Sequence, residues 1–279
     1  MNRQKRILAV HDISDIGRCS LTVALPIISA CGIETAVLPT AILSTHTGGF
    51  TGYTYRDLSD DIIPVTDHWR SLGIDFDAVY SGFLGSFRQL DIMYGLFSQY
   101  KEKGAVIIVD PVLGDNGSLY SVFGPEFVQG MRRLCSLADI ITPNITEGAL
   151  LAGMQYRLGG DDEYISTMLE GLHEITNAAV VLTGVVRGSE TGVAMREKNG
   201  DVTYTGSVQV DGIFHGTGDV FASAMTGAYM KCGNLQQAVR IAVDFTLESI
   251  LRTKAYNTEY RYGVCFEESI PSLIKALNL

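Results

Sequence analysis

A glycine-flanked turn that leads into a long, almost uncharged run decides the fold of this sequence. The turn and the run read Phe214-His215-Gly216-Thr217-Gly218-Asp219 and Val220-Phe221-Ala222-Ser223-Ala224-Met225-Thr226-Gly227-Ala228-Tyr229-Met230. Glycine permits a tight turn and a close approach of the backbone to a ligand. The run predicts a buried helix from Gly216 to Lys231, so Asp219 is expected in its first turn, where unpaired N–H groups attract anions. A carboxylate there is either an N-cap or a base beside a phosphate in transit.

Composition places the chain among globular proteins with a large core. It has 279 residues, of which 46% are hydrophobic and 19% charged. The formal net charge of −10 argues against a nucleic-acid partner, but not against a single nucleotide held by backbone N–H groups and a metal. The five cysteines form no Cys-x-x-Cys pair, so neither a zinc site nor a disulfide framework is indicated.

The N-terminal segment predicts a cytoplasmic protein with no membrane contact. Its apolar run, Ile7 to Val10, is too short for a signal peptide and is typical of a buried strand. No apolar run reaches the ~18 residues that a membrane span needs.

Strands and helices alternate along most of the chain, which is the signature of a parallel sheet covered on both faces. We expect strands over residues 6–11, 35–43, 78–81, 105–109, 139–142 and 178–182, and helices over 19–31, 67–72, 89–103, 126–134, 161–175, 216–231, 235–251 and 269–277. Residues 191–196 and 202–208 predict a hairpin, because an Asn-Gly turn signal lies between them. The expected fold is a single α/β domain over residues 1–279, with a mostly parallel central sheet and a small antiparallel edge.

Polar or glycine-bearing loops follow the predicted strands, and parallel strands bring such loops to one edge of the sheet. The residues concerned are Ser14, His46, Thr47, Asp110, Asp115, Asn144, Glu147, Thr183 and Gly184. Two aspartates five residues apart suit a hydrated Mg²⁺, which prefers one or two carboxylates plus phosphate oxygens. The loop over residues 116–125, with Tyr120 and Phe123, is long enough to act as a flap.

Several of these segments together resemble motifs of the ribokinase superfamily, and most closely those of its pyridoxal (vitamin B6) kinases. The segments are Gly216-Thr217-Gly218-Asp219, Asp110-Pro111-Val112-Leu113-Gly114-Asp115, Thr142-Pro143-Asn144-x-x-Glu147, Ser44-Thr45-His46-Thr47-Gly48 and Gly82-Phe83-Leu84-Gly85. The resemblance spans residues 6 to about 250, and the set at this spacing is far more specific than Gly-Thr-Gly-Asp alone. It implies the three-layer ribokinase-like fold and an ATP-dependent kinase for the 5'-hydroxymethyl group of a B6 vitamer.

The resemblance also implies residue roles, a homodimer, Mg²⁺ and a monovalent cation such as K⁺. Asp219 would be the general base. The N–H groups of Gly216, Thr217 and Gly218 would form the anion hole. The substrate residues would be Ser14, His46, Thr47 and Phe83; the ATP residues Asp110, Asp115, Asn144, Thr183 and Gly184; the metal residues Asp115 and Glu147; and the flap residues Tyr120 and Phe123.

Departures from the family pattern concentrate in the substrate pocket. The family's first motif is Ser-x-Gln-Ser followed by Tyr-Gly, whereas this chain has His11-Asp12-Ile13-Ser14-Asp15-Ile16-Gly17, and Phe83 stands where tyrosine is usual. The choice among pyridoxal, pyridoxamine and pyridoxine is therefore open. A hydroxymethylpyrimidine kinase is the nearest alternative, although that group usually has cysteine in place of Asp219.

A ligand-binding protein on the same fold, without catalysis, is a further alternative. The retention of Asp219 with both glycines disfavours it, because a binding protein needs no base. No Gly-x-Gly-x-x-Gly follows the first strand, and no P-loop or Gly-x-Ser-x-Gly occurs. Dinucleotide oxidoreductase, P-loop and hydrolase functions therefore have no support.

Overall fold

The computed structural model describes residues 3–256 and 260–279 of the chain. Its internal contacts form two compact units, one made of residues 1–80 and 209–279 and the other of residues 81–208. The single domain expected over residues 1–279 stays a prediction.

The strands of the first unit lie in the order β4-β1-β2-β3. They are β1 (Arg6–Ile16), β2 (Glu34–Thr45), β3 (Tyr55–Asp57) and β4 (Ala78–Ser81). β1 and β2 are parallel, and β3 is antiparallel to β2. Residues 7–10 of β1 are all buried, which explains why this stretch is apolar without alternation.

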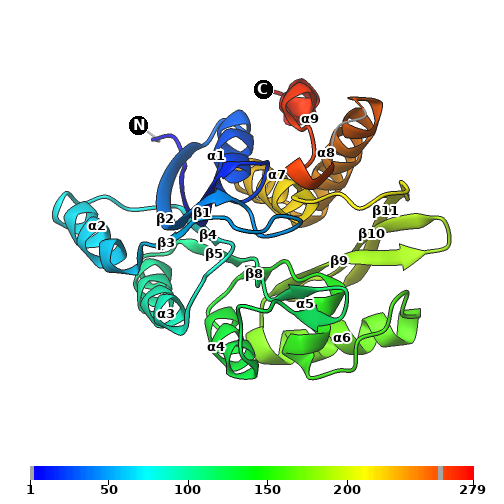
Figure 1. Cartoon of the computed structure of the whole chain (residues 1–279), viewed down its shortest axis with the longest axis horizontal. Helices are drawn as coiled ribbons and strands as arrows, with labels where there is room; N and C mark the ends of the chain where they lie inside the picture. Colours follow the sequence, from blue (N-terminus) through cyan, green and yellow to red (C-terminus); the bar gives the residue numbers. More distant parts are fainter. Residues whose placement is uncertain (1–2, 257–259) are drawn as a thin grey trace. The chain divides into compact units, whose positions relative to one another are not determined.

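Helices pack on these strands. They are α1 (Leu21–Ala30), α2 (Ser59–Ser71), α7 (Thr217–Cys232), α8 (Leu235–Tyr256) and α9 (Ile270–Ala276), with 3₁₀ turns at Tyr260–Tyr262 and Glu267–Ser269. Figure 1 shows α1, α7 and α8 lying together, in blue, gold and orange. α1 and α7 approach closely at Gly227, where a Cβ would lie 2.5 Å from the Sγ atom of Cys31. Small residues in the uncharged stretch of α7, residues 220–230, therefore let two buried helices pack tightly.

The second unit contains strands in the order β11-β10-β9-β8-β5 and a separate small hairpin, β6-β7. The strands are β5 (Val106–Val109), β6 (Gly114–Asp115), β7 (Ser118–Leu119), β8 (Ile140–Ile141), β9 (Ala179–Arg187), β10 (Glu190–Arg196) and β11 (Val202–Val208), and the helices are α3 (Phe87–Glu102), α4 (Pro125–Cys135), α5 (Ile145–Ala152) and α6 (Asp162–Thr176). β5, β8 and β9 are parallel, whereas β9, β10 and β11 are antiparallel. The mostly parallel sheet, its helices and the antiparallel edge are thereby confirmed.

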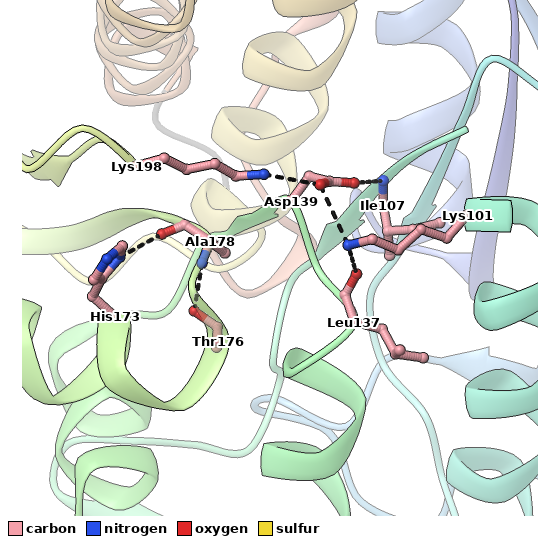
Figure 2. Close-up of polar contacts among 8 residues, drawn as sticks. All are labelled: Lys101, Ile107, Leu137, Asp139, His173, Thr176, Ala178 and Lys198. Atoms are coloured by element: carbon pink, nitrogen blue, oxygen red, sulfur yellow. Dashed lines mark hydrogen bonds and ion pairs between the residues drawn. The ribbon is translucent and has the colours of Figure 1, made fainter. Parts of the chain in front are cut away.

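Asp139 fixes the amino ends of the parallel strands in this unit (Figure 2). Its carboxylate accepts a hydrogen bond from the backbone N–H of Ile107 at 3.0 Å and forms ion pairs with Lys198 at 3.0 Å and Lys101 at 3.4 Å. Its backbone N–H donates to the carbonyl oxygen of Ile107 at 2.7 Å, and its carbonyl accepts from Ala179 at 3.0 Å. One residue, through its side chain and its backbone, thus joins β5, β8 and β9 at the edge opposite their carboxyl ends.

Some predicted boundaries were wrong. β1 continues through the expected loop to Ile16, and the expected short helix at residues 67–72 is the end of α2, which begins at Ser59. β9 does not end at Thr183 but continues to Arg187 through a bulge at Gly184, because it also pairs with β10. The short strands β3, β6 and β7 carry no alternating apolar pattern that could have predicted them.

In the part of the chain that the structure describes, no helix combines the length and the apolar character needed to cross a membrane.

Candidate active site

The glycine turn begins α7 as the sequence predicts. Gly216 is the N-cap, with a left-handed backbone (φ 74°), and no side chain caps the helix in the described structure. A Cβ at this position would collide with the carbonyl oxygen of Arg18, so only glycine fits. The hydroxyl of Thr217 donates to the carbonyl oxygen of Phe214 at 3.2 Å, which closes the turn. The first N–H groups of a 16-residue helix therefore remain available to an anion.

Gly218 has a different reason to be glycine. Its φ is not positive, and no atom lies within 4 Å of the place where a Cβ would stand. Neither backbone strain nor crowding within the protein excludes alanine, although glycine in a helix costs about 1 kcal/mol relative to alanine. A Cβ at Gly218 would therefore face open space beside the first turn of α7, and the phosphate site at this turn stays a prediction.

Asp219 is partly exposed at this turn. The pKa of Asp219 is raised to about 6: burial raises it, a hydrogen bond from the backbone of Ser20 lowers it, and the negative charge of Asp12 raises it. A carboxylate with this pKa is ionised at neutral pH and still has appreciable proton affinity, as a general base requires.

Ser14 lies on β1 and is fully buried. Its hydroxyl donates to Oδ2 of Asp12 at 3.2 Å. Asp12 is itself only 4% exposed, so the structure brings a second carboxyl group to the vicinity of Asp219. The substrate role of Ser14 stays a prediction.

His46 and Thr47 follow β2 at the same edge, since β1 and β2 are parallel. Thr47 is exposed, whereas His46 is buried and uses both ring nitrogens. Nδ1 accepts from the backbone N–H of Gly48 at 3.2 Å, so Nε2 carries the proton and donates to the carbonyl oxygen of Arg261 at 2.6 Å. Burial lowers the pKa of His46, and the neutral ring ties the loop to the C-terminal segment. Because both ring nitrogens of His46 are engaged, the exposed Thr47 is the more accessible hydrogen-bonding residue of the two.

Aromatic rings surround the loop after β2. Phe50 lies 5.0 Å from the ring of His46 and 5.3 Å from that of Tyr262, and the guanidinium of Arg261 stands 5.0 Å above the ring of Phe50. His215, beside the glycine turn, lies 5.7 Å from His46. These rings give this loop an apolar wall suited to a flat heteroaromatic molecule.

In the second unit, predicted nucleotide residues meet at the N-terminus of α5. Asn144 accepts from the backbone N–H of Glu147 at 2.9 Å and donates to the carbonyl oxygen of Gly114 at 3.0 Å. Asp110 directly follows β5 and is buried, whereas Asp115 is exposed on the β6-β7 hairpin. The backbone of Asn144 also bridges to Thr183 on β9. Asp110, Asp115, Asn144 and Thr183 therefore stand at the carboxyl edge that their loops predicted.

Glu147 is buried and forms a capping box with Asn144. Its oxygens accept from the backbone N–H groups of Asn144 at 2.8 Å and Leu113 at 3.1 Å. Burial raises the pKa of Glu147, and hydrogen bonds from the backbone of Asn144, Leu113 and Gly114 oppose this. Its contacts are those of a residue that holds the loop to the helix, so its role at a metal stays a prediction.

Gly184 lies in the β9 bulge with φ 75°, and a Cβ there would have open space. Thr183 is held to the loop before α5, with its N–H donating to the carbonyl oxygen of Pro143 at 2.9 Å. The glycine in this bulge is exposed, and bulges are common near active sites.

Phe83 and the predicted flap residue Phe123 are neighbours, with ring centroids 5.7 Å apart. Phe123 also stacks on Phe127 at 4.0 Å, so it is buried, whereas Tyr120 is exposed. The flap segment is therefore anchored at the buried Phe123, while the side chain of Tyr120 is 39% exposed.

The structure groups Ser14, His46 and Asp219 in the first unit, and Asp110, Asn144, Glu147 and Thr183 in the second. Sequence reasoning missed Asp12 and Ser20 beside Asp219, and Arg261 and Tyr262 beside the β2 loop. Asp12 carried a signal, a carboxylate two residues after the apolar run Ile7 to Val10, but the strand was expected to end at His11. Nothing in the sequence placed Arg261 beside His46, because the contact joins segments 215 residues apart.

Among the described residues, no group of three or more His, Cys, Asp or Glu side chains is arranged to hold a metal ion. All five cysteines are free thiols.

Comparison with known proteins places these features in one family. The sequence profile named phosphomethylpyrimidine kinase matches residues 25–263. Human pyridoxal kinase is 27% identical, with 90% of this chain and 86% of the human protein covered.

Solved structures of similar proteins share the fold of this chain over nearly its whole length. Pyridoxal kinase from Lactobacillus plantarum has a TM-score of 0.90 at 33% identity, covering 99% of this chain and 98% of its own. A Bacteroides thetaiotaomicron protein named as a candidate phosphomethylpyrimidine kinase, crystallised with pyridoxal, has a TM-score of 0.92 at 36% identity, covering 97% and 96%. The fold and the superfamily expected from the motifs are thus confirmed, and the chain belongs to the phosphomethylpyrimidine kinase family.

Proposed function

We infer that this protein is an ATP-dependent kinase that phosphorylates the 5'-hydroxymethyl group of a B6 vitamer, with Asp219 as the general base. The observation that carries the proposal is the turn at the start of α7. It combines a glycine N-cap that no other residue can replace, an open space beside Gly218, and a carboxylate whose pKa is about 6. The kinase names of the relatives, and pyridoxal in a solved relative, support the same reaction.

The chemistry follows from the groups at this turn. Asp219 takes the proton of the primary alcohol as the alcohol oxygen attacks the γ-phosphorus of ATP. The bond between that phosphorus and the bridging oxygen breaks, and ADP leaves. N–H groups of Gly216, Thr217 and Gly218, at the positive end of α7, stabilise the charge on the transferring phosphoryl group. Phosphoryl transfer depends mainly on positioning and charge stabilisation, so these groups suffice for this half of the reaction.

Nucleotide binding is assigned to the carboxyl edge in the second unit. Asp110, Asp115, Asn144, Thr183 and Gly184 supply oxygen atoms, an amide and an open backbone there. This donor set fits a hydrated Mg²⁺, because the carboxylate of Asp115 is exposed and Mg²⁺ prefers one or two carboxylates with water and phosphate oxygens. Bound Mg²⁺ would neutralise charge on the ATP phosphates. Glu147 would act at the metal through water, since its oxygens already accept backbone hydrogen bonds.

The acceptor is a flat heterocycle with a hydroxymethyl group. Ser14, His46, Thr47 and Phe83 are the residues proposed to bind it, and the rings of Phe50 and Tyr262 extend the apolar wall. His46 keeps Thr47 in place and does not contribute a free ring nitrogen. Tyr120 and Phe123 are proposed as the flap over the bound ligands.

Phosphorylation of a hydroxymethylpyrimidine is the second candidate, and the description of the matching family favours it. Both acceptors present a hydroxymethyl group on a six-membered nitrogen ring, so the same base serves either. The vitamer is preferred because the relatives named above include pyridoxal kinases from two organisms.

An enzyme-linked assay of ADP release tests the proposal. The purified chain is assayed with ATP and Mg²⁺ against pyridoxal, pyridoxamine, pyridoxine and hydroxymethylpyrimidine, with K⁺ and with Na⁺. The highest kcat/KM is expected for one of the three vitamers. A higher value for hydroxymethylpyrimidine would transfer the assignment to the second candidate, and no turnover with any acceptor would refute the kinase.

We also propose a homodimer. Ile16, Ile42 and Tyr55, on neighbouring β1, β2 and β3, are large apolar side chains exposed by 58%, 37% and 44%, and we propose that a second copy covers them. Light scattering on the purified protein is expected to give twice the mass of one chain. The mass of a single chain would refute the dimer.

A further inference from the structure

A short turn near the C-terminus, residues 260–263, contacts three loops that carry or adjoin proposed site residues. Its first three residues form a 3₁₀ helix, and the N–H of Gly263 donates to the carbonyl oxygen of Tyr260 at 3.2 Å, which closes the turn. The three loops are residues 46–53 after β2, residues 17–20 between β1 and α1, and residues 214–219 at the start of α7. The turn and all three loops belong to the first unit.

The first contact of this C-terminal turn is with the loop after β2. The carbonyl oxygen of Arg261 accepts the Nε2 proton of His46 at 2.6 Å. The guanidinium of Arg261 lies 5.0 Å from the ring centroid of Phe50 and 5.3 Å from that of Tyr262, and these two rings are 5.3 Å apart. A cation over the face of an aromatic ring is attracted to it. Arg261 therefore holds the loop at two places, His46 and Phe50.

The second contact is with Arg18, in the connection between β1 and α1. Its backbone N–H donates to the carbonyl oxygen of Tyr262 at 2.8 Å, and its guanidinium pairs with Glu267 at 2.6 Å. A Cβ on Gly263, whose φ is 88°, would lie 2.6 Å from the carbonyl oxygen of Arg18. The Cβ position of Gly216 faces that same oxygen. One carbonyl group thus lies against both the C-terminal turn and the glycine turn that begins α7.

The third contact is with Phe214, which leads into the glycine turn. The ring centroids of Tyr260 and Phe214 are 4.7 Å apart, and the carbonyl oxygen of Phe214 accepts the hydroxyl of Thr217. The C-terminal turn is itself tied to α8, because the N–H of Cys265 donates to Oγ1 of the buried Thr253 at 2.7 Å. Helix α8 therefore supports the turn, and the turn supports the three loops.

We propose that the C-terminal turn is a positioning element for the acceptor, which holds the loop of His46 and Phe50 and the glycine turn in place around the carbonyl group of Arg18. The proposal rests on the proposed function, in which His46 and Thr47 bind the acceptor and Asp219 is the base. The proposed nucleotide residues belong to the second unit. The turn is therefore expected to govern the acceptor and not the affinity for ATP.

Three variants test the turn, with one matched control. Gly263→Ala brings a Cβ against Arg18 and should displace the turn. Gly104→Ala is the control, because Gly104 has the same φ of 88° but open space at its Cβ position. Arg261→Met removes the cation and keeps an unbranched side chain, whereas Arg261→Lys keeps the cation. Both Arg261 variants leave the backbone of the turn unchanged, so they remain informative even if Gly263→Ala does not fold.

Steady-state kinetics are expected to separate the two substrates. Gly263→Ala should raise KM for the acceptor by about tenfold or more, because displaced positioning groups are costly, while KM for ATP stays within about twofold of the parent. Arg261→Met should raise KM for the acceptor about two- to fivefold, the effect of losing an exposed cation–π contact, and Arg261→Lys should lie nearer the parent. Gly104→Ala should keep the parental KM for both substrates.

A double-mutant cycle tests whether Arg261 acts through Phe50. Phe50→Leu combined with Arg261→Met should raise KM for the acceptor no further than Phe50→Leu alone, because the cation then has no ring on the loop to hold. The ring of Tyr262 belongs to the turn and not to the loop, so it does not replace Phe50. Additive effects of the two changes would show that Arg261 does not act through Phe50.

The proposal is overturned by equal rises of both KM values in a folded Gly263→Ala, or by a parental KM for the acceptor in Arg261→Met. If the parent chain phosphorylates no acceptor, the proposed function fails, and nitrogen NMR of the His46 ring still tests the turn without a substrate. The signal of the Nε2 proton, assigned with His46→Gln, should shift in Gly263→Ala and keep its position in Gly104→Ala. An unshifted signal in a folded Gly263→Ala would show that the turn does not position His46.

Discussion

The Cα atom of Gly216 faces the carbonyl oxygen of Arg18 so closely that a Cβ on Gly216 would collide with it. Arg18 precedes α1 and Gly216 begins α7, so this approach brings together two segments that are 198 residues apart in the chain. Because Asp219 follows Gly216 in the same turn, the close approach also fixes the turn that carries the proposed base against the start of α1.

Replacing Gly216 with alanine is expected to destabilise the protein and abolish activity. The change forces a residue with a Cβ into a left-handed backbone, at a cost of about 1 kcal/mol or more, and adds the collision with Arg18. Urea unfolding should show the loss. Gly233→Ala is the control, since Gly233 ends α7 with φ 71° but has open space around its Cβ position, so it tests the backbone cost without the collision. Equal losses of unfolding free energy in Gly216→Ala and Gly233→Ala would mean that the collision with Arg18 adds no destabilisation.

Gly218→Ala is expected to separate stability from function. A Cβ would meet no protein atom and would improve the helix, so the free energy of unfolding should stay the same or rise by up to about 1 kcal/mol. The same Cβ would enter the space proposed for the transferring phosphate, so kcat should fall by about 10²-fold. Calorimetry and the ADP-release assay measure the two effects. Parental kcat in a stable variant would place the phosphate elsewhere.

Asp219→Asn is expected to lower kcat by at least ~10²-fold and to leave the affinity for ATP largely intact. In the parent protein, activity should fall as the pH drops through about 6, because the base is protonated below its pKa. The effect of this carboxylate on the free energy of unfolding should have the opposite pH dependence to its effect on activity. The folded-state pKa is raised, so the folded protein binds this proton more tightly than the unfolded chain does, and the carboxylate destabilises the protein increasingly as the pH rises from about 4 to 6.

The stability measurement for this variant is therefore urea unfolding at two pH values. Asp219→Asn should be more stable than the parent at pH 7 and indistinguishable from it below about pH 4. A variant that is less stable at pH 7 would show that Asp219 is a structural cap, the alternative that the sequence left open.

The sequence predicted most of the fold because buried parallel strands need continuous apolar residues, as at residues 7–10 and 106–109. It also predicted which loops stand at the carboxyl edge, since parallel pairing fixes this. It could not separate Asp12 from a loop, because the strand continues past the apolar run only through its pairing with β2. It could not predict the contacts of Ser20 or Arg261 either, because these depend on where distant segments pack.

Glu147→Gln distinguishes a metal role from the capping role that the contacts show. If Glu147 acts only through the capping box, the variant should lose about 0.5–2 kcal/mol of stability, while the Mg²⁺ concentration that gives half-maximal activity stays within about twofold. Asn144→Ala removes the other half of the capping box and should give a similar loss of stability. A rise of tenfold or more in the Mg²⁺ requirement of Glu147→Gln alone would assign Glu147 to the metal.

Asp139→Asn tests the contacts at the opposite edge of the strands in the second unit (Figure 2). Burial raises the pKa of Asp139, but the N–H of Ile107 and the ammonium groups of Lys198 and Lys101 outweigh burial, so the net pKa is lowered. A carboxylate with a lowered folded-state pKa stabilises the protein above its unfolded pKa, and this contribution is lost as the pH falls through the folded pKa. Asp139→Asn should therefore lose about 1–2 kcal/mol at pH 7, with a smaller loss below about pH 4.

Urea unfolding at pH 7 and pH 3.5 measures this pH-dependent difference. Asp162→Asn is the matched control, because Asp162 also pairs with a cation, Arg187, but is 78% exposed. An exposed pair contributes little, so this variant should stay within about 0.5 kcal/mol of the parent. Both variants should keep the parental kcat. An equal loss for Asp139→Asn at both pH values would mean that its hydrogen bond to Ile107 alone carries the effect and that Lys101 and Lys198 contribute nothing.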